Sequence, residues 1–100
     1  MAMKMKLVNR GDSADVQLIG RLDVLSAPDA EKAMLEAANR FQSVCLDLEQ
    51  LEYISSAGLR AIKNFYIAIR KNGGTYSVKN VSKPIMEIFE ATGFVRLLKL

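Results

Sequence analysis

The sequence predicts an α/β fold, a small mixed β-sheet with helices covering at least one face, in the order ββαβαβα. Short segments with apolar residues at every second position or in an unbroken run, both typical of strands, alternate with longer segments of helical spacing. Turn residues join the first two strand-like segments, which predicts an antiparallel hairpin. A strand-like segment directly after the first helix predicts a β-α-β crossover, so the sheet should also contain parallel strands. We expect a single domain over residues 1–100.

The two strands of the expected hairpin are defined by alternation. Apolar residues alternate with lysines near the start of the chain, and the expected inward positions are Met3, Met5 and Leu7. Turn residues occupy positions 9–14. The inward positions expected after this turn are Val16, Leu18 and Gly20.

The first helix is expected to begin near Ser26 and to pack on the sheet. Ser26 precedes Pro28 and Asp29, a combination typical of a helix start, in which the hydroxyl caps free amides. The apolar residues at helical spacing are Ala30, Ala33, Met34, Ala37, Ala38 and Phe41. The next strand, residues 44–48, is nearly apolar throughout, as expected in the middle of a covered sheet. Asp47 within this strand is expected to hydrogen-bond free amides of the following loop.

The second half of the chain continues this alternation. An irregular loop over residues 49–54 leads to a second helix, which a glycine pair ends. The buried stripe expected on this helix comprises Leu59, Ile62, Phe65, Tyr66 and Ile69. Residues 75–79 are the fourth expected strand, and Ser82 and Gly93 mark the ends of a third helix. The apolar residues 94–100 are expected to add an edge strand or to pack as a coil.

The content of cysteine and histidine excludes several classes of function. The chain has one cysteine, Cys45, which we expect to be a buried, inert thiol, and it has no histidine. A structural zinc site needs several thiolates or imidazoles. A Ser/His/Asp or Cys/His nucleophile needs an imidazole base. We therefore expect no conventional hydrolase chemistry and no metal or other cofactor.

The distribution of charged and apolar residues indicates which classes of partner, and which cellular location, to expect for the protein. The net charge is +3, and the basic residues are interleaved with acids rather than gathered in a block, so we expect no nucleic-acid partner. The apolar runs are far shorter than a bilayer span, so no membrane insertion is expected. Residues 1–10 lack the features of a signal peptide, which leads us to expect a cytoplasmic protein.

Two adjacent serines stand where the second helix begins, in the segment EYISSAGL of residues 52–59. Ser56 lies at or next to the N-cap, and its hydroxyl has two interpretations. It caps the free amides of the first turn, or it is a place where a negative charge is added, which the helix dipole would stabilise. Ala57 and Gly58 keep large side chains away from this hydroxyl, which would let a second molecule approach the backbone closely.

The segment LDLEQLEYISSAGLRAI resembles the signature of the STAS domain of bacterial anti-sigma factor antagonists, in which a strand and a loop lead to Asp-Ser-Ser/Ala-Gly-Leu at a helix start. GRLDVLSAP is similar to the family's loop between the second strand and the first helix, and NGG and ATGFVRLL extend the resemblance over essentially the whole chain. The resemblance implies a STAS-like fold. It also implies that Ser56 is the family's phosphorylated serine and that Asp23 is the family's loop aspartate.

One position departs from the family pattern. The aspartate that usually precedes the phosphorylated serine is replaced here by Ser55. Two hydroxyls are therefore candidates for modification, and a charge that could orient a kinase is missing. We expect phosphorylation at Ser56, with Ser55 as a neighbour that caps the helix or forms a hydrogen bond.

The expected partner-binding surface comprises Asp23, Tyr53, Ser55, Ser56, Ala57 and Gly58. Two of these residues have a structural alternative. Asp23 either contacts the target hydroxyl or a basic group of the partner, or it stabilises its own turn. Tyr53 either anchors the partner or packs the loop onto the protein.

The resemblance implies a non-enzymatic switch. The unmodified protein binds an anti-sigma factor that is also a serine kinase, and so frees a sigma factor for transcription; phosphorylation of Ser56 ends the binding, and a serine phosphatase restores it. An alternative is a STAS interaction module that regulates a transporter, a signalling assembly or a lipid-trafficking complex. A third hypothesis, an anion- or nucleotide-binding enzyme, is disfavoured by the lack of histidine, of a glycine-rich loop with lysine and of a metal cluster.

Overall fold

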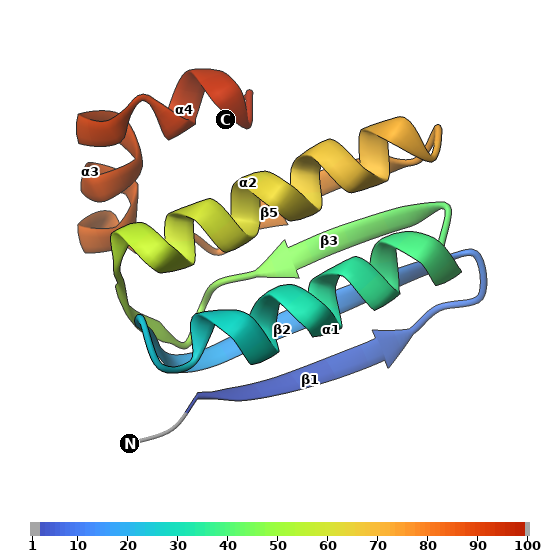
Figure 1. The fold of residues 1–100 in the computed structure, drawn as a ribbon, viewed down its shortest axis with the longest axis horizontal. Helices are drawn as coiled ribbons and strands as arrows, with labels where there is room; N and C mark the ends of the chain where they lie inside the picture. The colour runs from blue at the N-terminus through green and yellow to red at the C-terminus, as the bar shows by residue number, and fades with distance from the viewer. Residues whose placement is uncertain (1–2, 100) are drawn as a thin grey trace.

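The computed structural model of the protein describes residues 3–99 (Figure 1). The elements in this part of the chain are β1 (Lys4–Asn9), β2 (Ser13–Leu22), α1 (Ala27–Arg40), β3 (Ser43–Asp47), β4 (Leu51–Ile54), α2 (Ser56–Lys71), β5 (Thr75–Lys79), α3 (Lys83–Thr92) and α4 (Phe94–Leu97). The predicted α/β class is confirmed, and so are the expected ends of α3, Ser82 and Gly93. β4 and α4 differ from the predicted irregular loop and from the predicted edge strand or coil. Leu100, the last residue of that tail, lies outside the described residues.

The sheet has the strand order β1-β2-β3-β5, with β4 beside β2. β1 and β2 form the predicted antiparallel hairpin, whereas β2 with β3 and β3 with β5 pair in parallel, which confirms the crossover. The pairing of β4 is irregular, because Gly20 pairs with Leu51 but Arg21 pairs with Tyr53. The extra residue between Leu51 and Tyr53 breaks the period-two alternation, which explains why the sequence does not reveal this strand.

α1 and α2 form a layer over one face of the sheet, whereas α3 lies to one side, near the start of α2 (Figure 1). α1 and α2 run side by side in front of the sheet, and α4 lies on the other side of α2 from α1 (Figure 1). The largest fully buried side chains form one core, namely Leu18, Leu22, Met34, Val44, Leu46, Leu48, Ile62, Phe65, Ile69, Ile85 and Phe89. Fully burying one such side chain, rather than leaving it exposed, stabilises the fold by roughly 1.5–3 kcal/mol. No helix within residues 3–99 combines the length and the apolar character needed to cross a membrane.

Several expectations about burial are wrong, and one of them is the burial of Tyr66, which is half-buried on α2. The strand β3 is not covered on both faces: Val44 and Leu46 are buried under the helices, whereas Cys45 points to the opposite face and is half-buried. Successive side chains of a strand point to opposite faces, so an apolar run does not by itself show that both faces are covered. Leu7 is 43% exposed, because β1 is an edge strand that extends beyond the helical layer.

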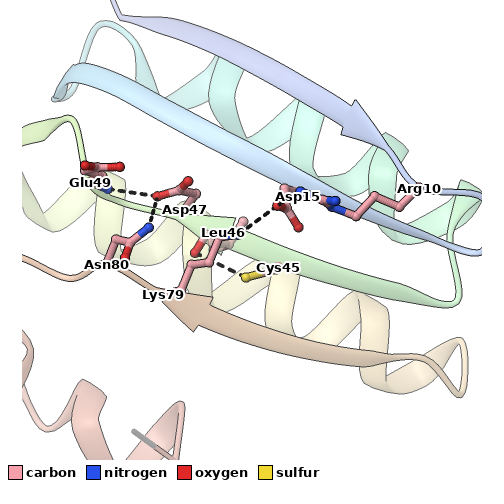
Figure 2. A network of polar contacts seen from close by, with 8 residues as sticks. All are labelled: Arg10, Asp15, Cys45, Leu46, Asp47, Glu49, Lys79 and Asn80. Carbon is pink, nitrogen blue, oxygen red and sulfur yellow. Dashed lines mark hydrogen bonds and ion pairs between the residues drawn. The ribbon is translucent and has the colours of Figure 1, made fainter.

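The open face of the sheet carries polar networks (Figure 2). Asp15 is buried there between two cations, with its Oδ2 at 2.8 Å from the Nζ of Lys79 and at 3.0 Å from the Nη2 of Arg10. The hydrogen bond from Lys79 is the main cause that lowers the pKa of Asp15; Arg10 acts in the same direction, and burial opposes both. Asp15 thereby connects β2 with β5 and with the hairpin turn.

Asp47 lies in the neighbouring network (Figure 2). Its Oδ1 accepts hydrogen bonds from the backbone N–H of Glu49 at 3.1 Å and from the side-chain amide of Asn80 at 3.1 Å. The predicted contact with a free amide of the following loop is confirmed. A carboxylate inside a strand is tolerated here because its face of the sheet is open and its oxygen has two donors.

Candidate functional site

The candidate site lies where β2, β4 and α2 meet. Ser55 is the N-cap of α2, with an extended backbone (φ −93°, ψ 175°), and its Oγ accepts a hydrogen bond from the N–H of Gly58 at 3.2 Å. Its own N–H donates to the carbonyl oxygen of Leu22 at 2.9 Å. Ser55 is half-buried and fixed on both sides. The predicted role of Ser55 as the capping neighbour is confirmed.

Ser56 is the first residue of α2, next to the N-cap as expected. The residue is exposed, and its hydroxyl has no side-chain hydrogen bond with any residue between 3 and 99. The first amides of a helix lack partners within the helix, and the helix dipole makes this end partly positive. The first turn of α2 contains no acidic residue. Of the two serines, Ser56 is therefore the accessible one, in a setting that tolerates a negative charge.

The interpretation of Gly58 changes with the structure. Gly58 is buried rather than open to a second molecule. A Cβ atom built on it would lie 2.7 Å from the Cγ of Leu22, 2.8 Å from the carbonyl oxygen of Leu22 and 2.9 Å from the Cγ1 of Ile54. The missing side chain thus lets α2 pack against the ends of β2 and β4. The expected approach of a partner to the backbone at Gly58 is wrong, because the protein itself fills that space.

The loop between β2 and α1 is held together by Asp23 and Ser26. The Oδ1 of Asp23 accepts hydrogen bonds from the N–H groups of Leu25 and Ser26, both at 3.0 Å, and from the Oγ–H of Ser26 at 3.2 Å. The Oγ of Ser26 in turn accepts from the N–H of Asp23 at 2.9 Å, and its single proton is shared between the Oδ1 of Asp23 and the carbonyl oxygen of Arg21 at 2.8 Å. Ser26 stands at the N-cap of α1 without a side-chain cap bond, so the prediction that its hydroxyl caps the helix is wrong.

The structure shows Asp23 in one of the two roles that the sequence left open, which is the stabilisation of its own turn. The N–H of Ser26 is the main cause that lowers the pKa of Asp23, which shows that the loop favours the charged carboxylate. Asp23 follows Leu22, whose carbonyl oxygen accepts a hydrogen bond from the N–H of Ser55, so the loop does lie beside the start of α2. No hydrogen bond joins the Asp23 carboxylate to Ser56 within the part of the chain that is described. Contact of Asp23 with a partner stays a prediction.

Sequence reasoning missed the most exposed apolar side chains near the site. Val24 is 69% exposed and Leu25 is 86% exposed, on the loop that Asp23 and Ser26 stabilise. Val24 also lines a groove of about 630 Å³ between α1 and α2, together with Ala57 and Arg60. The signal was available, because two apolar residues stand between polar ones in LDVLSAP. Ala57 is half-buried at the wall of this groove, next to the two serines.

Tyr53 on β4 is paired with Arg21 on the neighbouring strand β2, and their side chains are in contact. The guanidinium of Arg21 is 4.4 Å from the centre of the Tyr53 ring, a cation–π contact, and the tyrosine is 38% exposed. The ring is therefore held in place but accessible. Within residues 3–99 no three His, Cys, Asp or Glu side chains gather as a metal site would require.

Comparisons with known proteins agree with the fold. A family model described as STAS domain matches residues 4–100. The chain is 25% identical over 85 residues to the anti-sigma-B factor antagonist of Bacillus subtilis, a match that covers 85% of this chain and 78% of that protein. It is 29% identical over 87 residues to the anti-sigma F factor antagonist of Paenibacillus polymyxa, with coverage of 85% and 74%.

Solved structures match the fold at lower identity. The anti-sigma factor antagonist SpoIIAA in its unphosphorylated form is similar with a TM-score of 0.71 at 18% identity, over 89% of this chain and 82% of that chain. SpoIIAA of Bacillus in the phosphorylated form also gives a TM-score of 0.71 at 18% identity, over 92% and 84%. A sulfate transporter family protein from Wolinella succinogenes gives 0.78 at 16% identity, over 91% and 75%. These structures confirm the predicted arrangement of strands and helices.

Proposed function

Because the chain belongs to the STAS domain family, we propose that it is an anti-sigma factor antagonist, whose unmodified form binds a serine-kinase anti-sigma factor and is released by phosphorylation of Ser56. Binding would free a sigma factor for transcription. A serine phosphatase would restore the unmodified form. The protein acts in this proposal through binding alone, in the cytoplasm, and without a cofactor.

The observation that carries the proposal is the difference between the two serines. Ser55 is half-buried and its hydroxyl accepts a hydrogen bond from the N–H of Gly58, whereas Ser56 is exposed and its hydroxyl has no hydrogen bond within residues 3–99. A kinase needs a hydroxyl that can reach its bound nucleotide. Ser56 satisfies this need without any unfolding of the helix start, although the family's preceding aspartate is absent.

The surface around Ser56 supports binding to a protein. Leu25 and Val24 project from a loop that its own hydrogen bonds keep rigid, so little conformational entropy would be lost when a partner covers them. Tyr53 adds an aromatic side chain whose ring is already oriented by Arg21. An apolar pocket on the partner would complement this surface.

The effect of phosphorylation follows from electrostatics. A phosphate adds roughly −1.5 to −2 charges at neutral pH. At the first position of α2 the helix dipole favours that charge, so the fold should persist. A partner that has covered the bare hydroxyl would instead have to bury the charge without a matching cation, which is costly. The partner is therefore released.

The proposal is tested by phosphate mapping in the presence of the native partner. A pull-down from the native cell identifies the partner, and the purified partner with ATP and Mg²⁺ should add one phosphate, which fragmentation mass spectrometry should locate on Ser56. Ser56→Ala should block the modification and retain binding; Ser55→Ala, the matched control, should still be phosphorylated. A phosphate on Ser55 would contradict the assignment.

A second candidate function is kept because the fold also matches a sulfate transporter family protein. In that case the chain is a constitutive interaction module whose partner is not an anti-sigma factor. If the native lysate modifies neither serine and the recovered partner is not a kinase, this candidate replaces the first.

A further inference from the structure

All the charged residues on the outward face of α2 are basic. The residues of α2 that are exposed are Ser56, Arg60, Lys63, Ile67, Arg70 and Lys71. With 3.6 residues per turn, their spacing places them within an arc of about 100° on one side of the helix. The helix contains no acidic residue, so the expectation that basic residues are interleaved with acids fails on this helix. We use the name basic strip for five of these residues, namely Arg60, Lys63, Ile67, Arg70 and Lys71.

The cations of the basic strip form no ion pair with any residue between 3 and 99. The ion pairs formed within residues 3–99 both involve Asp15, on the sheet rather than on α2. Arg70 donates to the hydroxyl of Tyr66 at 3.0 Å and lies 5.4 Å from its ring, contacts that orient the guanidinium but leave its charge. The basic strip therefore presents four cations along a helix of about 24 Å.

An exposed apolar residue stands in the middle of these cations. Ile67 is 43% exposed, while the apolar face of the same helix, including Ile62, Phe65 and Ile69, is fully buried in the core. A membrane-binding helix needs a broad apolar face free to enter the lipid, which α2 does not offer. Contacts to a nucleic-acid backbone come from cations and polar groups, and they would leave Ile67 without a role. A protein surface with acidic groups around an apolar hollow complements both the charges and Ile67.

We propose that the basic strip is a docking surface for an acidic face of the same protein partner that contacts Ser56. This inference rests on the proposed function and specifies the chemistry of its partner. Ser56 lies at one end of the strip, one helical turn before Arg60. A phosphate there adds negative charge opposite the acidic face, so repulsion acts along the strip in addition to the cost of burying the phosphate.

The docking surface is tested first with a defined probe, a synthetic helical peptide in which a leucine stripe is flanked by glutamates. The variant Lys63→Glu with Lys71→Glu should weaken its binding about tenfold relative to the wild type. The matched control is Lys4→Glu with Lys6→Glu on β1, which makes the same change in net charge at exposed positions and should leave the affinity within about twofold. Ile67→Ala should also weaken binding. Thermal melts confirm that each variant is folded.

Several results would overturn the inference. Equal loss in both double variants would show a general charge effect without a docking surface. Tighter binding of single-stranded DNA at the same salt concentration, insensitive to Ile67→Ala, would assign the strip to nucleic acid, and preferential binding of phosphatidylserine vesicles would assign it to a membrane surface.

The native partner separates this inference from the proposed function. If Ser56 is phosphorylated and the partner is released, but Lys63→Glu with Lys71→Glu binds the partner as tightly as the wild type, the docking surface is wrong and the switch stands. If the double variant fails to bind the native partner while neither serine is ever modified, the docking surface stands and the switch is wrong.

Discussion

The Oγ of Ser55 accepts a hydrogen bond from the backbone N–H of Gly58 across 3.2 Å, which assigns different tasks to two adjacent serines. Ser55→Ala should lower the free energy of unfolding by about 1 kcal/mol, because the cap is lost. Ser56→Ala should change the free energy of unfolding by less than about half a kcal/mol, since an exposed side chain that makes no cap hydrogen bond contributes little to stability. Urea titrations of both variants measure the difference. Equal losses would show that Ser56 also has a structural contact.

Gly58→Ala separates packing from helix propensity. Alanine in a helix is favoured over glycine by about 1 kcal/mol, so propensity alone predicts stabilisation. The Cβ contacts with Leu22, including its carbonyl oxygen at 2.8 Å, predict the opposite sign. We expect a net loss of about 1–3 kcal/mol, typical of overpacking. A higher melting temperature for Gly58→Ala would mean that Leu22 and Ile54 yield easily and that packing does not require the glycine.

Asp23 and Leu25 should affect stability and binding differently. Asp23→Ala removes an acceptor of several loop hydrogen bonds, so it should lower both the melting temperature and the affinity for the partner. Leu25→Ser changes a side chain that is 86% exposed, so it should leave the melting temperature unchanged and weaken only the binding. Calorimetry and partner titration test the pair. Unchanged affinity for Leu25→Ser would exclude this loop from the interface.

Asp15 should make stability depend on pH. Folding lowers the pKa of Asp15, mainly through the hydrogen bond from Lys79, so the unfolded chain takes up the proton first. The contribution is complete above the unfolded pKa and is lost as the pH falls from about 4 toward the lower pKa of the folded protein. Asp15→Asn should be about 1–2 kcal/mol less stable near neutral pH.

The comparison with the wild type isolates this contribution. The stability difference between Asp15→Asn and the wild type should shrink as the pH falls through that range. The pKa of Asp23 is also lowered, but this contribution is present in both proteins and cancels in the difference. Asp12→Asn, at an exposed position, is the control, and urea titrations across the range supply the data. A difference that does not vary with pH would exclude an ionic role for Asp15.

Patterns of neighbouring residues were sufficient for most of the secondary structure. The stripe of α2 is spaced at 3.6 residues per turn, and four of its five expected members are buried, namely Leu59, Ile62, Phe65 and Ile69. The fifth, Tyr66, is only half-buried. Ser82 and Gly93 mark the ends of α3, because caps depend on backbone geometry within one turn. The neighbouring role of Ser55 at the start of α2 follows from the same local rules.

Contacts between distant segments decided the rest. The sequence could not show that Leu22 fills the space beside Gly58, or that the carboxylate of Asp23 accepts hydrogen bonds from its own loop. Nor could it show that Cys45 lies on the open face of the sheet. β4 escapes recognition because its irregular pairing with β2 interrupts the alternation. The spacing of apolar residues reports which side of an element is buried, since that depends on local backbone geometry. It does not report what covers that side, because this depends on how the chain brings α2 against the ends of β2 and β4.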